Sequence, residues 1–85
     1  MEVYVITKMC DYGDGMNVSV VGCSTDLSAA RIEMDSEVDS FLEDNDLTED
    51  DVKYRDNDKV EISRAYVDNM DDYVVAEFEI HHSSL

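Results

Sequence analysis

A chain of 85 residues with 22 acidic and 6 basic residues carries a formal net charge of −16 at pH 7. That charge disfavours direct binding to DNA, RNA or an anionic membrane, which would repel the chain, and it favours basic partners. The length fits one small domain. No stretch approaches the ~20 apolar residues of a membrane span, and the N-terminus lacks the basic and apolar regions of a signal peptide. We therefore expect a cytoplasmic protein.

Two segments rich in β-branched and aromatic residues predict an N-terminal hairpin, with strands at residues 2–8 and 17–25. Residues 12–15 between them, Tyr-Gly-Asp-Gly, are typical of a turn because glycine and aspartate tolerate positive φ. Cys10 and Cys23 would not meet in this hairpin, so we expect two free thiols. Apolar side chains fall on both faces of the hairpin, and one helix can cover only one face. The other face is partly exposed or covered by a partner, and a homodimer is a candidate assembly.

Residues 26–44 predict the main helix of the fold. Ser24, Thr25 and Asp26 each have a side chain suited to an N-cap. Six apolar residues then recur at helical spacing and define a face that packs inward: Leu27, Ala30, Met34, Val38, Phe41 and Leu42. Acidic residues occupy the opposite arc and crowd the C-terminal end, where the helix dipole disfavours negative charge. Because that placement opposes stability, it indicates that these acids serve another purpose.

A short helix is expected at about residues 48–54. Thr48 and Asp51 have the spacing of a capping box, in which each side chain accepts a hydrogen bond from the other residue's backbone. The helix lasts only a turn or two, because residues 55–58, Arg-Asp-Asn-Asp, are typical of a turn.

A second hairpin is expected from strands at residues 59–67 and 72–80, after which residues 81–85 fray. The chain then forms one α+β domain with the order ββαββ, in which the main helix crosses one face of a four-stranded antiparallel sheet. In the favoured register, Ile62 lies opposite Phe78 in the core. On the outer face the same register sets acids opposite one another with no local partner, which predicts a second acidic patch: Glu61, Glu77 and Glu79.

Several chemistries that use carboxylates do not fit the spacing. A calcium-binding EF-hand needs glycine at its sixth position and glutamate at its twelfth, and loops that start at Asp44 or Asp46 have neither. His81 and His82 with the two cysteines are too sparse for a structural zinc site, so we expect neither metal nor cofactor. Paired carboxylates can act as acid and base in a cleft, but here they cover a convex helix face, so we expect no enzyme.

The remaining feature is the density of carboxylates between residues 33 and 51. Ten of these nineteen residues are acidic and none is Lys or Arg. B-DNA carries one negative charge per ~1.7 Å of axis, and carboxylates on a helix that rises ~1.5 Å per residue can approach that density. We therefore predict a surface that imitates nucleic-acid phosphate. The residues predicted to bind the partner are Glu33, Glu37, Asp39, Glu43, Asp44, Asp46, Glu49, Asp50 and Asp51.

In its size, its charge and this acidic run, the chain resembles the small acidic inhibitors that bacteriophages and other mobile elements make against host defences. These include anti-CRISPR and anti-restriction proteins that mimic DNA. The resemblance implies a stoichiometric inhibitor that occupies the basic groove of a CRISPR-Cas effector or a restriction enzyme. Its partner would be a basic nucleic-acid-binding protein in the host bacterial cytoplasm, without direct contact to nucleic acid or membrane.

A second interpretation of the composition stays open. Charge runs are usually solvated surfaces, and in a halophilic organism such a composition is a solubility adaptation. The chain would then be a small acidic cytosolic structural or protein-interaction module. Charge reversal distinguishes the two interpretations, because only the inhibitor loses its partner when acids such as Glu43 are replaced.

Overall fold

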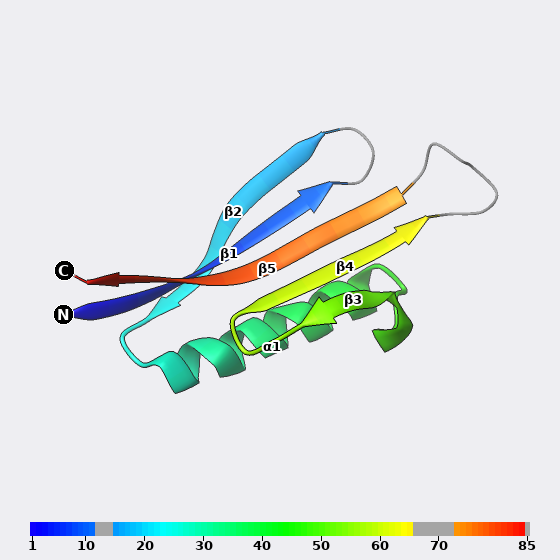
Figure 1. Ribbon diagram of the computed structural model, residues 1–85. Coiled ribbons are helices and arrows are strands. Elements are labelled where there is room, and N and C mark those ends of the chain that lie inside the picture. The colour runs from blue at the N-terminus through cyan, green and yellow to red at the C-terminus, as the bar shows by residue number, and fades with distance from the viewer. Residues whose placement is uncertain (12–14, 66–72, 85) are drawn as a thin grey trace.

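The computed structural model describes residues 1–11, 15–65 and 73–84. Its elements in chain order are β1 (Glu2–Asp11), β2 (Met16–Ser24), α1 (Leu27–Asp44), the 3-10 helix η1 (Glu49–Asp51), β3 (Val52–Arg55), β4 (Lys59–Ala65) and β5 (Tyr73–Ser84). The strands form one antiparallel sheet in the order β2-β1-β5-β4-β3, and α1 lies across one face of it (Figure 1). The α+β prediction is confirmed, but the sheet has five strands instead of four. The turns expected at 12–15 and 68–71 fall largely outside the described residues.

The fifth strand, β3, lies in the segment predicted as a short helix over residues 48–54. The capping box forms as expected, with the Thr48 backbone N–H donating to Asp51 Oδ2 at 2.9 Å, but η1 ends after three residues. The next four residues, Val-Lys-Tyr-Arg, include a β-branched and an aromatic residue, which favour an extended backbone. A tight turn then returns the chain, so β3 pairs with β4. The prediction of a helix to residue 54 is therefore wrong.

The core lies between α1 and the sheet. The helix buries five of the six residues predicted to face inward, and Leu27 in its first turn is half-buried: the buried five are Ala30, Met34, Val38, Phe41 and Leu42. The sheet contributes Ile6, Cys10, Val60, Ile62, Val74, Ala76 and Phe78. The rings of Phe41 and Phe78 meet edge to face with centroids 5.8 Å apart. This packing fixes the rotation of α1 about its own axis, and so decides which of its acids reach solvent.

The register between β4 and β5 differs from the prediction by two residues. Ile62 lies opposite Ala76 instead of Phe78, which pairs with Val60. A shift of two leaves every side chain on its predicted face, because side chains alternate between faces with a period of two. The core face was therefore predicted correctly, while the cross-strand partners were not.

The residues expected to fray extend the sheet instead. β5 continues to Ser84, which pairs with Glu2 at the start of β1. The rings of Tyr4 and His82 stack with centroids 4.9 Å apart, and the His82 ring also contacts the Glu2 carboxylate. The two ends of the chain consequently lie side by side (Figure 1).

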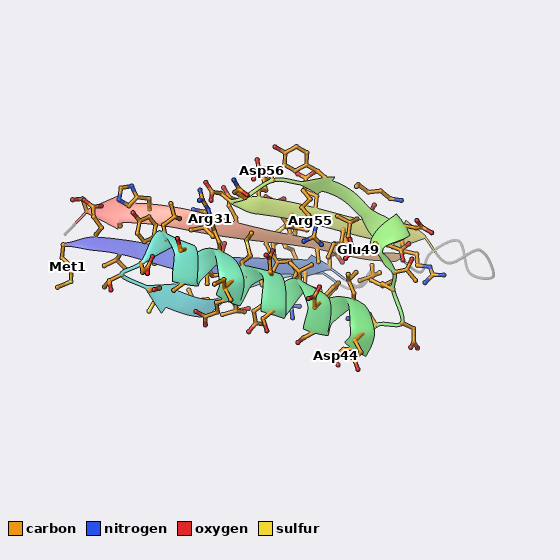
Figure 2. The ribbon with its side chains drawn as sticks, turned by 90° about the horizontal axis from the view of Figure 1, so that it is seen from below. Met1, Arg31, Asp44, Glu49, Arg55 and Asp56 are labelled. Carbon is orange, nitrogen blue, oxygen red and sulfur yellow. The ribbon has the colours of Figure 1, made fainter. Side chains whose placement is uncertain are left out.

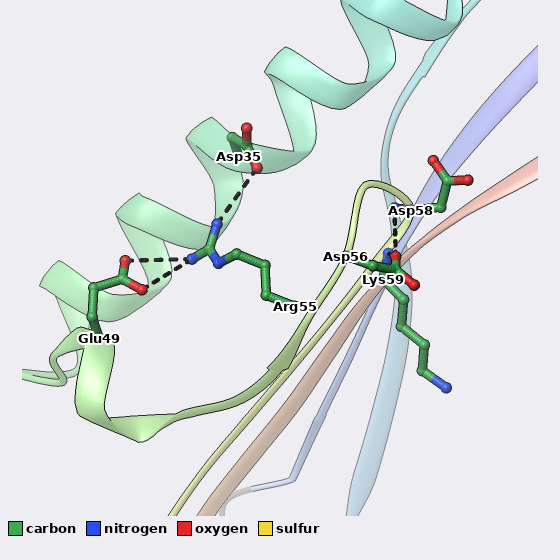
Figure 3. Close-up of polar contacts among 6 residues, drawn as sticks. All are labelled: Asp35, Glu49, Arg55, Asp56, Asp58 and Lys59. Carbon is green, nitrogen blue, oxygen red and sulfur yellow. Dashed lines mark hydrogen bonds and ion pairs between the residues drawn. The ribbon is translucent and has the colours of Figure 1, made fainter.

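One carboxylate organises the turn between β3 and β4. Asp56 Oδ1 accepts hydrogen bonds from the backbone N–H groups of Asp58 and Lys59, both at 2.8 Å (Figure 3). Asp56 Oδ2 accepts one from the Tyr54 hydroxyl at 2.6 Å. The Tyr54 hydroxyl and these N–H groups hold the pKa of Asp56 below its ordinary value. The same hydroxyl contact raises the pKa of Tyr54.

Replacing Asp56 with Ala is expected to lower the melting temperature at neutral pH, because two backbone donors and one hydroxyl lose their acceptor. The folded-state pKa of Asp56 lies below the unfolded value of ~3.9, so its contribution is present above about pH 4 and is lost as the pH falls through the folded-state value. Melting curves of Asp56→Ala and wild type should differ at neutral pH and converge in acid. The control is Asn57→Ala, whose side chain makes no hydrogen bond within the described residues. Equal melting temperatures for the two variants at neutral pH would contradict this role of Asp56.

Candidate functional site

Backbone hydrogen bonds close the C-terminal end of α1, together with the Asn45 side-chain amide, which donates to the Phe41 carbonyl at 2.8 Å. The Leu47 N–H donates to the Leu42 carbonyl at 2.8 Å and the Asp46 N–H to the Glu43 carbonyl at 3.3 Å, which is the pattern of a Schellman motif. Asp46 takes the left-handed conformation, with φ of 55°, at the position where glycine is usual. The last turn of α1 contains no basic residue. The carboxylates of Glu43 and Asp46 therefore add to the negative end of the helix dipole.

The acids of α1 form two rows along the helix and not one continuous wall. At about 100° per residue, the line directly opposite the core is exposed and is neutral up to its last turn: Ala29, Ile32, Ser36 and Ser40. The same line ends at Glu43, in the last turn of α1. One row of acids follows the side of the helix toward β2: Glu33, Glu37 and Asp44. The other row follows the side toward β3: Asp35 and Asp39. The face predicted to bind a partner is thus divided by this neutral line, which we call the neutral crest: Ala29, Ile32, Ser36 and Ser40.

The row toward β2 has no cation at ion-pair distance within the described part of the chain. The carboxylate of Glu33 lies over the β2 backbone, in the space that a β-carbon at Gly22 would fill. Glu33 and Glu37 are half-buried, and Asp44 is exposed. Lys8 lies beneath the helix with its Nζ 5.2 Å from the ring centroid of Phe41, a cation–π contact.

Arg55 of β3 pairs with the other row. Its guanidinium lies 3.6 Å from Asp35 Oδ1 and 3.3 Å from both carboxylate oxygens of Glu49 (Figure 3). Asp39, one turn further along the helix, is exposed and lacks such a partner among the described residues. The β3 side of α1 is therefore partly neutralised, and Glu49 is held in a contact within the fold.

The end of α1 carries the most exposed group of unpaired acids. We call Glu43, Asp44 and Asp46 the helix-end cluster; all three are exposed, and their carboxylates form no ion pair within the described residues. Figure 2 shows Asp44 projecting into solvent at the tip of the helix, away from Arg55 and Glu49. Arg64 donates to the backbone carbonyl of Asp46 at 3.0 Å.

The two other predicted binding residues differ from each other. Asp50 is exposed, and its carboxylate has no ion-pair partner within the described residues. The side chain of Asp51 is only 13% exposed, caps η1 and lies 3.8 Å from Arg64. Asp51, like Glu49, is therefore a structural residue. The remaining seven of the nine predicted residues have no ion pair with any residue that the structure describes: Glu33, Glu37, Asp39, Glu43, Asp44, Asp46 and Asp50.

The second predicted patch has a local cation, contrary to expectation. Lys59 Nζ lies 3.4 Å from Glu61 and 3.3 Å from Glu77, and the contacts with Glu77 and then Glu61 raise the pKa of Lys59. Glu79 lies opposite Lys59 in the strand pairing and 3.9 Å from His81. The two-residue difference in register brings Lys59 among these acids. The prediction of an acidic patch without a local partner is therefore wrong.

A shallow depression of about 220 Å³ lies on the outer face of the sheet, lined by Lys53, Glu61, Ile62, Ser63, Val75, Ala76 and Glu77. Small-molecule sites usually occupy roughly 300–1,000 Å³. The depression is smaller, and it lies on the side of the sheet opposite α1, so it is separate from the acidic helix.

Among the described residues, no three His, Cys, Asp or Glu side chains meet in an arrangement that could hold a metal ion. The same residues include no helix with the length and apolar character needed to cross a bilayer. Cys10 is buried, Cys23 is exposed, and both are free thiols as expected. No protein-family model, curated protein or solved structure matches the chain.

Proposed function

We propose that the chain is a stoichiometric inhibitor whose acidic helix occupies the basic groove of a bacterial defence nuclease, a CRISPR-Cas effector or a restriction enzyme, in place of nucleic acid. The observation that carries this proposal is the unpaired acidity of α1. Glu33, Glu37, Asp39 and the helix-end cluster have no ion-pair partner within the described residues. Their carboxylates are therefore free to form charge-assisted hydrogen bonds with incoming Lys and Arg side chains.

The charge spacing on α1 is close to that of one nucleic-acid strand. Six acids lie between residues 33 and 44. That stretch spans about 16 Å at ~1.5 Å per residue, which gives one charge per ~3 Å. One DNA strand carries a phosphate per ~3.4 Å of axis, and a duplex twice that density. The helix is therefore a closer mimic of a single strand, or of one strand of a short duplex, than of a whole duplex.

The neutral crest supplies a contact that charge alone does not. Ile32 is 71% exposed between the two acidic rows. Screened charge pairs at the rim of an interface contribute mainly to the association rate, whereas an apolar side chain buried at its centre contributes affinity and selectivity. A basic groove with a small apolar site at its centre would fit this helix better than a uniformly charged groove.

A complex that salt and DNA both disrupt is the expected result of a capture experiment. The immobilised protein, incubated with bacterial lysate, should retain a nucleic-acid-binding protein at low salt. The partner should be released at high salt, because screening weakens contacts between exposed charges. Excess DNA should release it as well, because both ligands would use one groove.

Two variants of equal net charge test whether the helix-end cluster binds. The test variant neutralises it with Glu43→Gln, Asp44→Asn and Asp46→Asn; asparagine suits position 46 because it tolerates the φ of 55°. The control makes the same change in net charge, from −16 to −13, at exposed sites outside the acidic rows: Thr25→Lys, Asn57→Lys and Ser83→Lys. The test variant should lose at least about tenfold in affinity, which corresponds to ~1.4 kcal/mol, while the control keeps its partner. Equal binding by both variants would contradict the proposal and favour a merely solvated surface.

A further inference from the structure

The longest uncharged run of this highly charged chain coincides with an edge of the sheet. Residues 15–25 contain no Asp, Glu, Lys or Arg, although a third of the chain is charged. They include the whole of β2, which in the described part of the chain has a neighbouring strand, β1, on one side only. An edge strand presents unpaired backbone N–H and C=O groups, and proteins usually protect such an edge with charge, proline or short length. β2 has nine residues, no charge and no proline.

The opposite edge of the same sheet is protected. β3 has four residues, two of which are the basic residues Lys53 and Arg55. Both features discourage pairing with another chain. The difference between the edges shows that the lack of protection at β2 is local, and not general to this sheet.

The exposed side chains of β2 indicate which kind of partner strand can cover this edge. Met16, Val18 and Val20 alternate on the outer face, the side away from α1, and are 65%, 67% and 66% exposed. They make up half of the large apolar residues that are exposed in the described part of the chain. A β-bulge at Val21 interrupts the pairing with β1, so Met16–Val20 is the regular part of the strand.

We propose that β2 pairs antiparallel with β2 of a second copy of this chain, with Val18 on the two-fold axis. In this register each Met16 lies opposite Val20 of the copy, and the two Val18 side chains are neighbours. Directly opposed residues in an antiparallel pair lie on the same face, so the exposed apolar side chains of both copies join into one strip. The alternating strand is therefore complementary to itself, as a two-fold interface requires.

Charge favours a second copy over a basic partner at this edge. Two chains of −16 repel one another over most of their surface, and β2 is where they can approach without opposing carboxylates. A basic partner, in contrast, would find no acid on β2 to pair with its Lys and Arg side chains. The pairing places both α1 helices on one side of a sheet continuous through both copies, with their Glu33 and Glu37 rows turned toward the axis.

The position of these rows gives the dimer an unusual salt dependence. Repulsion between Glu33 and Glu37 of the two copies opposes association and is screened as salt is added. Dimerisation should therefore strengthen with salt, whereas capture of a basic partner by α1 should weaken. The two effects are independent, so failure of one leaves the other proposal standing.

Sedimentation velocity of the purified chain over a range of concentrations tests the pairing without any nuclease present. The wild type should shift from monomer to dimer with concentration, and more readily near 1 M NaCl, where the Debye length is about 3 Å. Val18→Lys sets two like charges across the axis and should weaken the dimer by at least about tenfold. Asn57→Lys adds the same charge at an exposed site in the turn between β3 and β4, at the opposite edge of the sheet, and should leave the dimer unchanged. Circular dichroism should show that both variants stay folded.

A cross-link tests the register. Val18→Cys combined with Cys23→Ser should form a disulfide dimer on mild oxidation, because residues paired across strands lie within disulfide range. Ile32→Cys with Cys23→Ser should remain largely monomeric. Cys10 is 5% exposed and does not compete. A wild type that stays monomeric at every concentration and salt, or a dimer insensitive to Val18→Lys, would overturn the proposal.

Discussion

Replacing Phe78 with Ala is expected to remove a large share of the free energy of unfolding. Phe78 is fully buried, stands at the centre of β5 and meets the Phe41 ring edge to face. Truncating a buried phenylalanine typically lowers the free energy of unfolding by about 3–5 kcal/mol. Part of the loss comes from the apolar contacts that are removed, and part from the cavity that remains. A chain of 85 residues has a total stability of roughly 4–13 kcal/mol. Chemical denaturation followed by circular dichroism measures the loss.

The matched control removes an apolar side chain that is exposed. Ile32→Ala lies on α1, the helix that packs against Phe78, but its side chain is 71% exposed. Its free energy of unfolding should stay within about 0.5 kcal/mol of wild type. A Phe78→Ala variant as stable as Ile32→Ala would show that the helix does not pack on the sheet as described.

Neutralising the helix-end cluster should make the protein more stable while it removes the binding surface. Glu43 and Asp44 lie in a last turn without basic residues, and Asp46 follows it at a positive φ. Each charge at the wrong end of a helix dipole costs about 0.3–1 kcal/mol at low ionic strength, so the triple variant should gain about 1–2 kcal/mol. For a domain of this size that gain corresponds to a rise of roughly 5–15 °C in melting temperature.

The salt dependence of the gain tests whether the helix dipole causes it, because salt screens the interaction between the carboxylates and the dipole. The gain should be largest at low ionic strength and shrink at high salt. The control variant with three lysines elsewhere relieves the same net charge without touching the helix end, and it should gain less. Stabilisation of both variants by equal amounts would show that total charge is the cause, and not the position of the cluster.

The sequence pattern predicted the helix well because helical periodicity and burial are tied to each other. Five apolar residues of α1 are buried as expected, and Asp26 caps the helix by accepting from the Ser28 N–H at 2.9 Å. The strand β3 was missed because the capping box at Thr48 is a genuine helix signal. Such a signal marks where a helix begins and does not say how far it extends.

The site was predicted only in outline, since a run of acids does not show which of them have partners. Arg55 lies four residues beyond the acidic run in sequence, yet in space it joins Asp35 to Glu49. Alternation of apolar residues is equally satisfied by registers two apart, so Lys59 could not be placed between Glu61 and Glu77. The sequence does contain a signal for the division of these acids: Ala29, Ile32, Ser36 and Ser40 recur at helical spacing and define a line along α1 that is neutral up to Ser40.

The pairing of β1 with β5 also determines when this protein can fold. These neighbouring strands come from opposite ends of the chain, with Glu2 paired to Ser84. During synthesis the N-terminal hairpin and α1 must therefore wait for β5, which brings Val74, Ala76 and Phe78 to the core. Such non-local pairing favours folding in milliseconds to seconds and not microseconds. Throughout that interval the chain's own negative charge keeps unfinished copies apart, so the acidity that weakens the finished domain protects it while it forms.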